Sequence, residues 1–273
     1  MDVGTKPAAY TSAVNALHRV SYLMAELGDS SEMKTQTVAA YQRFEQSLVT
    51  AYSGSIDLWE IGNEVNGEWV GSTKKEVAKI TDAYDTVTSA GGATALTLYY
   101  NPTCATKPSH QTFAWAKANI PASMKSGLND VLISYYPDDC HNYWPTQAGW
   151  QSVFDQLHAI FPHARLGFGE SGINADKGTA ATKAALLTKY HSLDIAGDNY
   201  VSVYFWWYFA EDALPYQGNA VWNALSSAMT EPGASPLATS KDGPRKVPTS
   251  PAKPWSPGWC TGTPESPESP PRG

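Results

Sequence analysis

Short apolar runs recur along this chain at nearly constant spacing, and this spacing constrains the fold more than any other feature. Their carboxyl ends fall near residues 28, 64, 101, 137, 170 and 208, so the successive steps are 36, 37, 36, 33 and 38 residues. The six runs are 20–27, 57–64, 94–101, 130–137, 165–170 and 200–209. Each is rich in β-branched and aromatic residues and too short for a typical helix, which favours buried parallel strands.

Helical patterns lie between these runs, at 11–19, 32–52, 74–90, 146–162 and 179–193, and Ser30 and Ser31 can cap the second of them. Alternating strands and helices predict an α/β fold with a parallel sheet. The steps suit a (β/α)8 TIM-type barrel, which allots about 31 residues to each unit. A doubly wound sheet also fits the alternation, but its usual G-x-G-x-x-G is absent. Because six strands are visible and a closed barrel has eight, we predict an incomplete barrel without the first two strands and with open edges.

Composition excludes several classes of partner and divides the chain in two. The formal net charge is -7 and no basic run occurs, so nucleic acid is not an expected partner. No apolar run approaches the roughly 20 residues of a membrane span, and the start of the chain shows no signal-peptide pattern. Residues 231–273 hold eleven of the nineteen prolines, which predicts a disordered tail after a barrel domain at 1–230. The oligomeric state is left open.

The stretch from Asp57 to Trp69 reads DLWEIGNEVNGEW and places Glu60, Glu64 and Glu68 four residues apart. On a helix they would form one acidic face, but two glycines and two asparagines within the stretch disfavour a helix. As a strand, the stretch places Glu60 and Glu64 on one side and Asn63 on the other. We therefore predict that a strand ends at Glu64 and is followed by a turn.

A second glutamate ends another predicted strand. Glu170 closes RLGFGE, in which Gly167 and Gly169 leave room beside the backbone, and it follows Glu64 by 106 residues. That interval is about three barrel units, so both carboxylates are expected at the carboxyl ends of strands three apart, where barrel active sites lie. Two carboxylates across a cleft are the machinery of glycoside hydrolysis; at about 5–5.5 Å one attacks the anomeric carbon and the other protonates the leaving oxygen. The alternative is that each glutamate forms an ordinary ion pair.

Two motifs resemble a known family. WEIGNEVNG, which contains Glu64, resembles the fourth-strand motif of the clan A retaining glycoside hydrolases, and GFGESG, which contains Glu170, resembles their seventh-strand motif. The likeness covers about residues 20–225. It implies that Glu64 is the acid/base, that Glu170 is the nucleophile, and that Asn63 is a partner of the sugar 2-hydroxyl. The expected reaction is hydrolysis of a carbohydrate through a covalent glycosyl-enzyme, and the alternative is a non-catalytic or decayed carbohydrate-binding barrel.

The same resemblance implies aromatic groups around the sugar. A tyrosine near the nucleophile is expected at Tyr136, or second at Tyr135, and a tryptophan floor at Trp206, or second at Trp207. Strand alternation turns one member of each pair away from the site. We also include three residues at predicted strand ends or mouth loops as substrate-binding candidates: Asn101, Trp69 and Trp144.

Cys104 and Cys140 follow neighbouring predicted strands, so they lie on adjacent loops of one face and either form a disulfide or remain free thiols. A disulfide would indicate an extracellular setting for the parent protein. The cluster of Asp138, Asp139, Cys140 and His141 lacks ligand spacing on a rigid element, so we predict no metal. No cofactor is predicted either, since no Gly-rich phosphate loop follows the late strands. A serine hydrolase is not indicated, because the sequence has no G-x-S-x-G motif.

Overall fold

The computed structural model describes residues 1–174, 176–203 and 205–230. Its sheet has six parallel strands in the sequential order β1 to β6. The strands are β1 Met24–Glu26, β2 Leu58–Glu60, β3 Thr94–Tyr99, β4 Asp130–Tyr135, β5 Arg165–Ser171 and β6 Tyr200–Val203. This sequential parallel order is that of a partial TIM-type barrel, as the spacing of the apolar runs predicts. The tail predicted at 231–273 lies outside the described residues.

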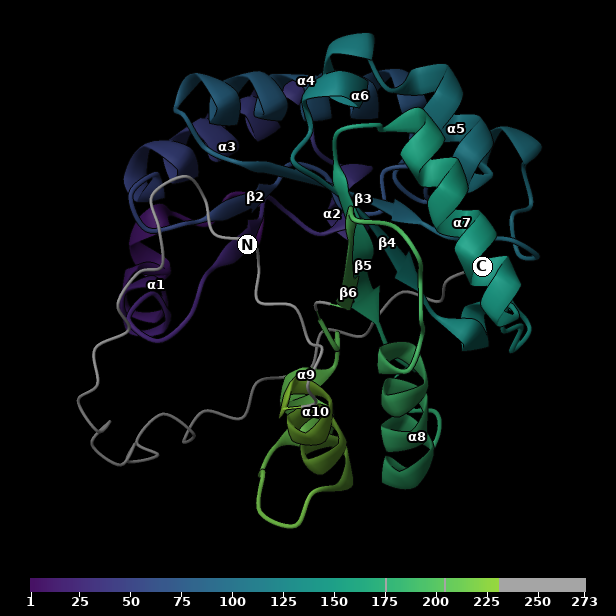
Figure 1. Cartoon of the computed structure of the whole chain (residues 1–273). Helices are drawn as coiled ribbons and strands as arrows, with labels where there is room; N and C mark the ends of the chain where they lie inside the picture. The colour runs from purple at the N-terminus through teal and green to yellow at the C-terminus, as the bar shows by residue number, and fades with distance from the viewer. Residues whose placement is uncertain (175, 204, 231–273) are drawn as a thin grey trace.

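Helices connect the strands and cover the sheet. Figure 1 shows α3, α4, α5, α6 and α7 along one side of the sheet, and α8, α9 and α10 grouped beyond β5 and β6. The α-helices are α1 Thr11–Leu17, α2 Ser30–Met33, α3 Val38–Tyr52, α4 Thr73–Ser89, α5 Thr112–Asn119, α6 Ala122–Gly127, α7 Gln147–Ile160, α8 Ala180–His191, α9 Phe209–Ala213 and α10 Ala220–Thr230. The 3-10 helices are η1 Pro7–Ala9, η2 Pro108–His110 and η3 Pro137–Cys140.

One predicted helix, 32–52, is divided in the structure. Asp29 rather than Ser30 or Ser31 caps α2, because its carboxylate accepts a hydrogen bond from the Ser31 amide at 2.7 Å. The chain then breaks, and the Thr37 hydroxyl caps α3 by accepting from the Ala40 amide at 3.1 Å. The prediction of one helix was therefore wrong: two capping residues define two helices, and the short α2 begins four residues after the end of β1.

The sheet has two packed faces. Toward the helices, Trp59, Leu96, Ile133 and Phe168 join the main hydrophobic core. Toward the barrel interior, a smaller cluster contains Leu58, Ala95 and Leu132, with Met24 and Ala93 against it. Alternation along β2 explains the division, since Leu58 and Trp59 are neighbours in sequence and lie on opposite faces. At the carboxyl ends of the strands the interior face turns from apolar to polar.

A buried glutamate on α3, Glu45, lies beside the part-buried Asp82 of α4. The carboxylate of Glu45 accepts a hydrogen bond from Thr86 at 3.1 Å, and Asp82 accepts one from Gln42 at 2.8 Å. Burial, followed by a hydrogen bond and charge repulsion from Asp82, raises the pKa of Glu45 to about 9. The folded protein therefore keeps a proton that Glu45 of the unfolded chain loses above about pH 4.5, so stability falls as pH rises from there toward 9.

We predict that Glu45→Gln stabilises the protein at pH 8 by on the order of 1–2 kcal/mol, because the amide stays neutral at no cost. Denaturant unfolding at pH 5 and pH 8 checks this, and the gain should be smaller at pH 5. Asp85→Asn is the matched control, because Asp85 is exposed on α4. An equal effect of Glu45→Gln at both pH values would contradict a buried, protonated Glu45.

Candidate active site

A β-bulge turns Glu170 toward the barrel interior. Ile133 of β4 pairs with Phe168, but the next residue, Ser134, pairs with Glu170, so Gly169 is an extra residue in β5. Strict alternation would place Glu170 on the same face as Phe168, which packs in the helix-facing core. The inserted residue reverses this and directs the carboxylate into the site, which is a common use of bulges beside active sites.

Glycine is required at the bulge because the interior face is already filled. A Cβ added at Gly169 would lie 2.9 Å from Cβ of Leu132 and 3.0 Å from Oγ1 of Thr97, both closer than ordinary contacts. The glycine that left room in the sequence motif therefore also permits the backbone displacement that presents Glu170.

Glu64 is presented to the site by the backbone conformation of the segment that follows β2. β2 ends at Glu60, four residues before the predicted strand end, and Glu64 has a φ of 45°, in the left-handed region that non-glycine residues rarely adopt. A Cβ at Gly62 would lie 2.6 Å from Ile80, so this position faces the helix-facing core. The predicted alternation was therefore wrong here: regular pairing ends at Glu60, backbone hydrogen bonds to β3 continue at Ile61 and Gly62, and Asn63 lies on the same side as Glu60.

Hydrogen bonds link Glu64, Asn63 and Glu170 in one buried network. Glu170 accepts hydrogen bonds from the Tyr136 hydroxyl, at 2.6 Å, and from the Asn63 side-chain amide. Glu64 accepts hydrogen bonds from the hydroxyl groups of two serines, Ser30 at 3.0 Å and Ser134. These residues come from β4, β5, the start of α2 and the segment after β2, so four separate parts of the chain converge at the carboxyl ends of the strands.

Two more carboxyl groups lie at the same place. Glu26 and Glu60 are register partners on β1 and β2, and the Asn63 amide also lies 3.4 Å from the Glu60 carboxylate. Burial and then the charge of Glu170 raise the pKa of Glu60 to about 8. Burial raises the pKa of Glu26 and Glu170 well above the ordinary value, with the charge of Glu60 adding at Glu26 and that of Glu64 at Glu170. Because like charges repel strongly in a buried site, the cluster holds protons at neutral pH.

Donors at Glu170 act against this rise. The hydrogen bonds from Tyr136 and Asn63 favour the charged carboxylate and lower the pKa of Glu170 relative to burial alone. At Glu26 the opposing influence is the positive charge of the Met1 ammonium group, while the Oε1 atom is buried without a hydrogen-bond partner among the described residues and burial keeps the pKa raised. Burial outweighs these donors, so the pKa of Glu170, like that of Glu26, stays well above the ordinary value.

Other predicted aromatic residues lie away from this network. Tyr135 is fully buried on the helix-facing side of β4, with its ring centroid 5.3 Å from that of Trp150. Trp144 belongs to the same aromatic cluster, 4.8 Å from Tyr190, and Lys189 covers its ring at 4.2 Å. Of the two tyrosines, the structure thus brings Tyr136 to Glu170 and turns Tyr135 into the core.

The two predicted floor tryptophans also face different ways. Trp206 is buried against Leu187 and Val221, and its indole donates a hydrogen bond to Asp212 at 2.8 Å. Trp207 has 37% of its surface exposed, and its backbone amide donates a hydrogen bond to the carbonyl oxygen of Ser171, next to Glu170. Trp207 is therefore the exposed member, on the segment hydrogen-bonded to the end of β5, while Trp206 lies in the layer formed by α8, α9 and α10.

Of the remaining candidates, Trp69 adjoins the network and Asn101 does not. The Trp69 indole donates a hydrogen bond to the Ser30 hydroxyl at 3.0 Å, and its ring packs edge-on against Tyr99. The Asn101 amide donates to the His110 carbonyl oxygen at 3.0 Å and accepts from the Thr112 amide at 3.0 Å. Asn101 therefore organises the loop after β3.

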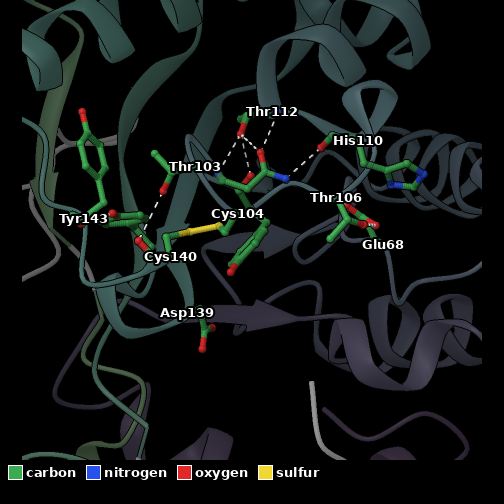
Figure 2. The surroundings of a disulfide bond; sticks show 12 residues. Glu68, Thr103, Cys104, Thr106, His110, Thr112, Asp139, Cys140 and Tyr143 are labelled. Atoms are coloured by element: carbon green, nitrogen blue, oxygen red, sulfur yellow. Dashed lines mark hydrogen bonds between the residues drawn. A yellow bond between two sulfur atoms is a disulfide. The ribbon is translucent and has the colours of Figure 1, made fainter. Parts of the chain in front are cut away.

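A disulfide joins the loops that follow β3 and β4. Figure 2 shows the bridge between Cys104 and Cys140, whose Cα atoms are 4.9 Å apart, and the hydrogen bond from Thr103 to the Cys140 carbonyl oxygen. Glu68, in the same view, accepts hydrogen bonds from the backbone amides of Thr106 and Lys107. Covalent and polar contacts thus hold together the loops at the carboxyl ends of the strands.

We predict one free thiol per chain without reductant and three after reduction under denaturing conditions, because the sequence has three cysteines. Closing a loop of 36 residues stabilises a protein by about 3–4 kcal/mol through the unfolded chain, so reduction should lower the melting temperature by several degrees. Cys260→Ser is the control and should leave the reduction effect unchanged. Three thiols before reduction would contradict the bridge.

Among the described residues, no group of three or more His, Cys, Asp or Glu side chains is arranged to hold a metal ion. In the same part of the chain, no helix combines the length and the apolar character needed to cross a membrane.

Comparisons with known proteins give a match in structure alone. No family model and no curated protein matches the sequence. A thermostable mutant of the xylanase Xyn10A from Cellvibrio japonicus matches with a TM-score of 0.54 at 9% identity, covering 82% of this chain and 83% of that one. The catalytic core of xylanase A matches with a TM-score of 0.53 at 10% identity, over 84% and 85% of the two chains. A GH10 xylanase from Thermobacillus composti matches with a TM-score of 0.50 at 13% identity, over 81% of each chain.

The fold is a partial TIM-type barrel similar to that of these xylanases. The described sheet has six of the eight strands of such a barrel, and the sequence resemblance at WEIGNEVNG and GFGESG points to the same fold. At identities of 9–13% the likeness extends to the fold, while the reaction rests on the residues of the site.

Sequence reasoning missed four polar residues of this site: Glu26, Glu60, Ser30 and Ser134. Glu60 carried a usable signal, because alternation from Leu58 places it on the interior face. Ser134 on β4 carried a similar one, since it lies two residues before Tyr136, which directly follows the strand. Ser30 carried none beyond its position near a helix start, because its contacts depend on how α2 meets the segment after β2.

Proposed function

We propose that this chain is a retaining glycoside hydrolase with Glu170 as nucleophile and Glu64 as acid/base. One observation carries the proposal: two separate sets of hydroxyl and amide donors hold the two carboxylates within one buried hydrogen-bond network at the carboxyl ends of the strands. Retaining glycosidases need two such carboxyl groups with different tasks.

The reaction would proceed in two displacements. In the first, the Glu170 carboxylate forms a bond to the anomeric carbon as the glycosidic bond breaks, and Glu64 gives its proton to the leaving oxygen. In the second, Glu64 takes a proton from water, whose oxygen attacks the anomeric carbon and releases Glu170. Asn63, which directly precedes Glu64 in the sequence and donates a hydrogen bond to Glu170, is the proposed partner of the sugar 2-hydroxyl.

The charges around Glu170 support its role. A nucleophile must be ionised, and Tyr136 and Asn63 both donate hydrogen bonds to Glu170. Glu60, with a pKa raised to about 8, is neutral at pH 7 and so adds no full charge beside the nucleophile. Both features favour the ionised form of Glu170 against the burial that raises its pKa.

A glycan is the proposed substrate class. The structures that share the fold are named as xylanases, so xylan is the first polymer to test. Trp207 and Trp69 are proposed to contact sugar rings, since Trp207 is exposed next to β5 and Trp69 is part-buried beside Ser30. We place Tyr136 at the nucleophile and assign no substrate contact to Tyr135, Trp144, Trp206 or Asn101.

Incubation with xylan, carboxymethylcellulose and β-mannan tests the proposal. The expected result is release of reducing ends from one of these polymers, with the product anomer seen first by proton NMR having the configuration of the substrate bond. Release of the opposite anomer would contradict Glu170 as nucleophile. Binding of a glycan in calorimetry without hydrolysis of any glycan would favour a non-catalytic carbohydrate-binding barrel instead.

A further inference from the structure

Ser30, the first residue of α2, is buried and contacts both residues of the Asn63–Glu64 pair. Its backbone amide donates a hydrogen bond to Oδ1 of Asn63 at 3.0 Å, and its hydroxyl donates to Oε2 of Glu64 at 3.0 Å. The Trp69 indole donates to the same hydroxyl at 3.0 Å. Ser30 itself is 2% exposed, so water does not compete for these bonds.

The direction of the Ser30 hydroxyl follows from its partners. An indole N–H only donates, so the Ser30 oxygen must accept from Trp69 and has its own proton left to give. That proton goes to Glu64, whose Oε2 is thereby fixed as an acceptor. Trp69 thus orients Ser30, and Ser30 orients the Glu64 carboxyl group from the side opposite to Ser134.

Ser30 also sets the orientation of Asn63. Because its amide binds the Asn63 oxygen, the Asn63 nitrogen must point the other way, toward Glu170 and Glu60. Asp29 fixes this amide in turn, since its cap on Ser31 holds the first turn of α2. One residue from a neighbouring element therefore determines how two consecutive side chains of the site are presented.

Glu64 needs such external support. Its φ of 45° lies in the left-handed region, which is strained for a non-glycine residue and persists only where surrounding contacts hold it. An acid/base also works only in a narrow range of orientations relative to the leaving oxygen.

We propose that Ser30 is a positioning residue, which holds the Glu64 carboxyl group in the orientation needed for proton transfer and is itself oriented by Trp69. The proposal rests on the proposed function of Glu64. It applies to the hydroxyl alone, because the backbone bond to Asn63 survives replacement of the side chain.

Leaving-group dependence provides the kinetic test. The substrates are 2,4-dinitrophenyl and methyl β-glycosides of xylobiose, cellobiose and mannobiose, and the disaccharide that the wild type cleaves is used. Methyl glycosides need a proton at the leaving oxygen and dinitrophenyl glycosides do not, so Ser30→Ala should lower kcat/KM about 10-fold or more for the methyl glycoside and less than about 2-fold for the dinitrophenyl one. Ser31→Ala, at an exposed neighbour, should change neither value. An equal loss on both substrates would overturn the proposal.

A spectroscopic test works without activity. In proton–nitrogen NMR spectra, Ser30→Ala should move the Trp69 indole N–H resonance upfield, and Glu64→Gln should move it too, because the hydroxyl links the two groups. Trp69→Phe identifies the resonance. If Ser30→Ala folds poorly, Ser30→Gly, which also lacks the hydroxyl, replaces it in the kinetic test with the same expected selectivity. An indole resonance indifferent to both Ser30→Ala and Glu64→Gln would overturn the proposal even in an active enzyme. If the Trp69 indole resonance shifts in both variants but the wild-type protein cleaves no glycoside, the hydrogen bonds through Ser30 are supported and the proposed glycosidase function is contradicted.

Discussion

Glu170→Ala is expected to reduce turnover of every cleaved glycoside by more than about 10³-fold, because the variant lacks the group that forms the bond to the anomeric carbon. The hydrogen bonds that Tyr136 and Asn63 give to Glu170 would be lost, but neither residue can act as a nucleophile in its place. Initial rates on the dinitrophenyl glycoside measure the loss.

Added azide should partly restore turnover of Glu170→Ala, since a small anion can occupy the space of the missing carboxylate and attack the anomeric carbon. The product would then be a glycosyl azide of inverted configuration, which NMR identifies. Glu211→Ala, at an exposed carboxylate on α9, is the control and should retain full activity with no response to azide. Full activity of Glu170→Ala would end its assignment as nucleophile.

Glu64→Ala is expected to lower kcat/KM for the methyl glycoside by about 10²–10⁴-fold and to leave kcat/KM for the dinitrophenyl glycoside nearly unchanged. The reason is that the first displacement needs a proton only when the leaving oxygen is strongly basic. The second displacement still lacks its base, so kcat on the dinitrophenyl substrate should fall and the glycosyl-enzyme should accumulate.

Azide gives this second variant a different signature from the first. It should raise kcat of Glu64→Ala on the dinitrophenyl glycoside by attacking the glycosyl-enzyme without a base, and the glycosyl azide should have retained configuration. The Glu211→Ala control applies here as well. If Glu64→Ala formed a glycosyl azide of inverted configuration, Glu64 would be the nucleophile and Glu170 the acid/base, which contradicts the assignment made here.

The fold was predictable because its signal is repeated. Six apolar runs at intervals of 33–38 residues gave the number, order and direction of the strands. The bounds were less predictable: β2 covers three residues of the eight expected, because Gly62 and the left-handed Glu64 take the chain out of the sheet. The run at 200–209 likewise contains both β6 and the first residue of α9, since apolar residues serve equally in a strand and in a helix.

Only those site residues were predictable whose type and position at a strand end together indicate a reaction, as a glutamate at such a position does. Glu64 and Glu170 stood out for this reason, although the presentation of Glu170 depends on a register shift at Gly169 that no local pattern reveals. The choice between Tyr135 and Tyr136 follows from alternation once one neighbour is placed, because the two faces of β4 differ. The role of Ser30 could not be predicted from the sequence, since it arises from the packing of α2 against the segment after β2.

Mass spectrometry of a trapped intermediate tests the assignment of Glu170 most directly. The wild-type protein is treated with the 2-deoxy-2-fluoro, 2,4-dinitrophenyl derivative of the disaccharide it cleaves, digested and sequenced. We predict one added fluorosugar per chain, attached to the peptide that carries Glu170, with none on the peptide that carries Glu64. A label on any other residue, or cleavage of the disaccharide substrate with no covalent adduct and with inverted product, would contradict double displacement through Glu170.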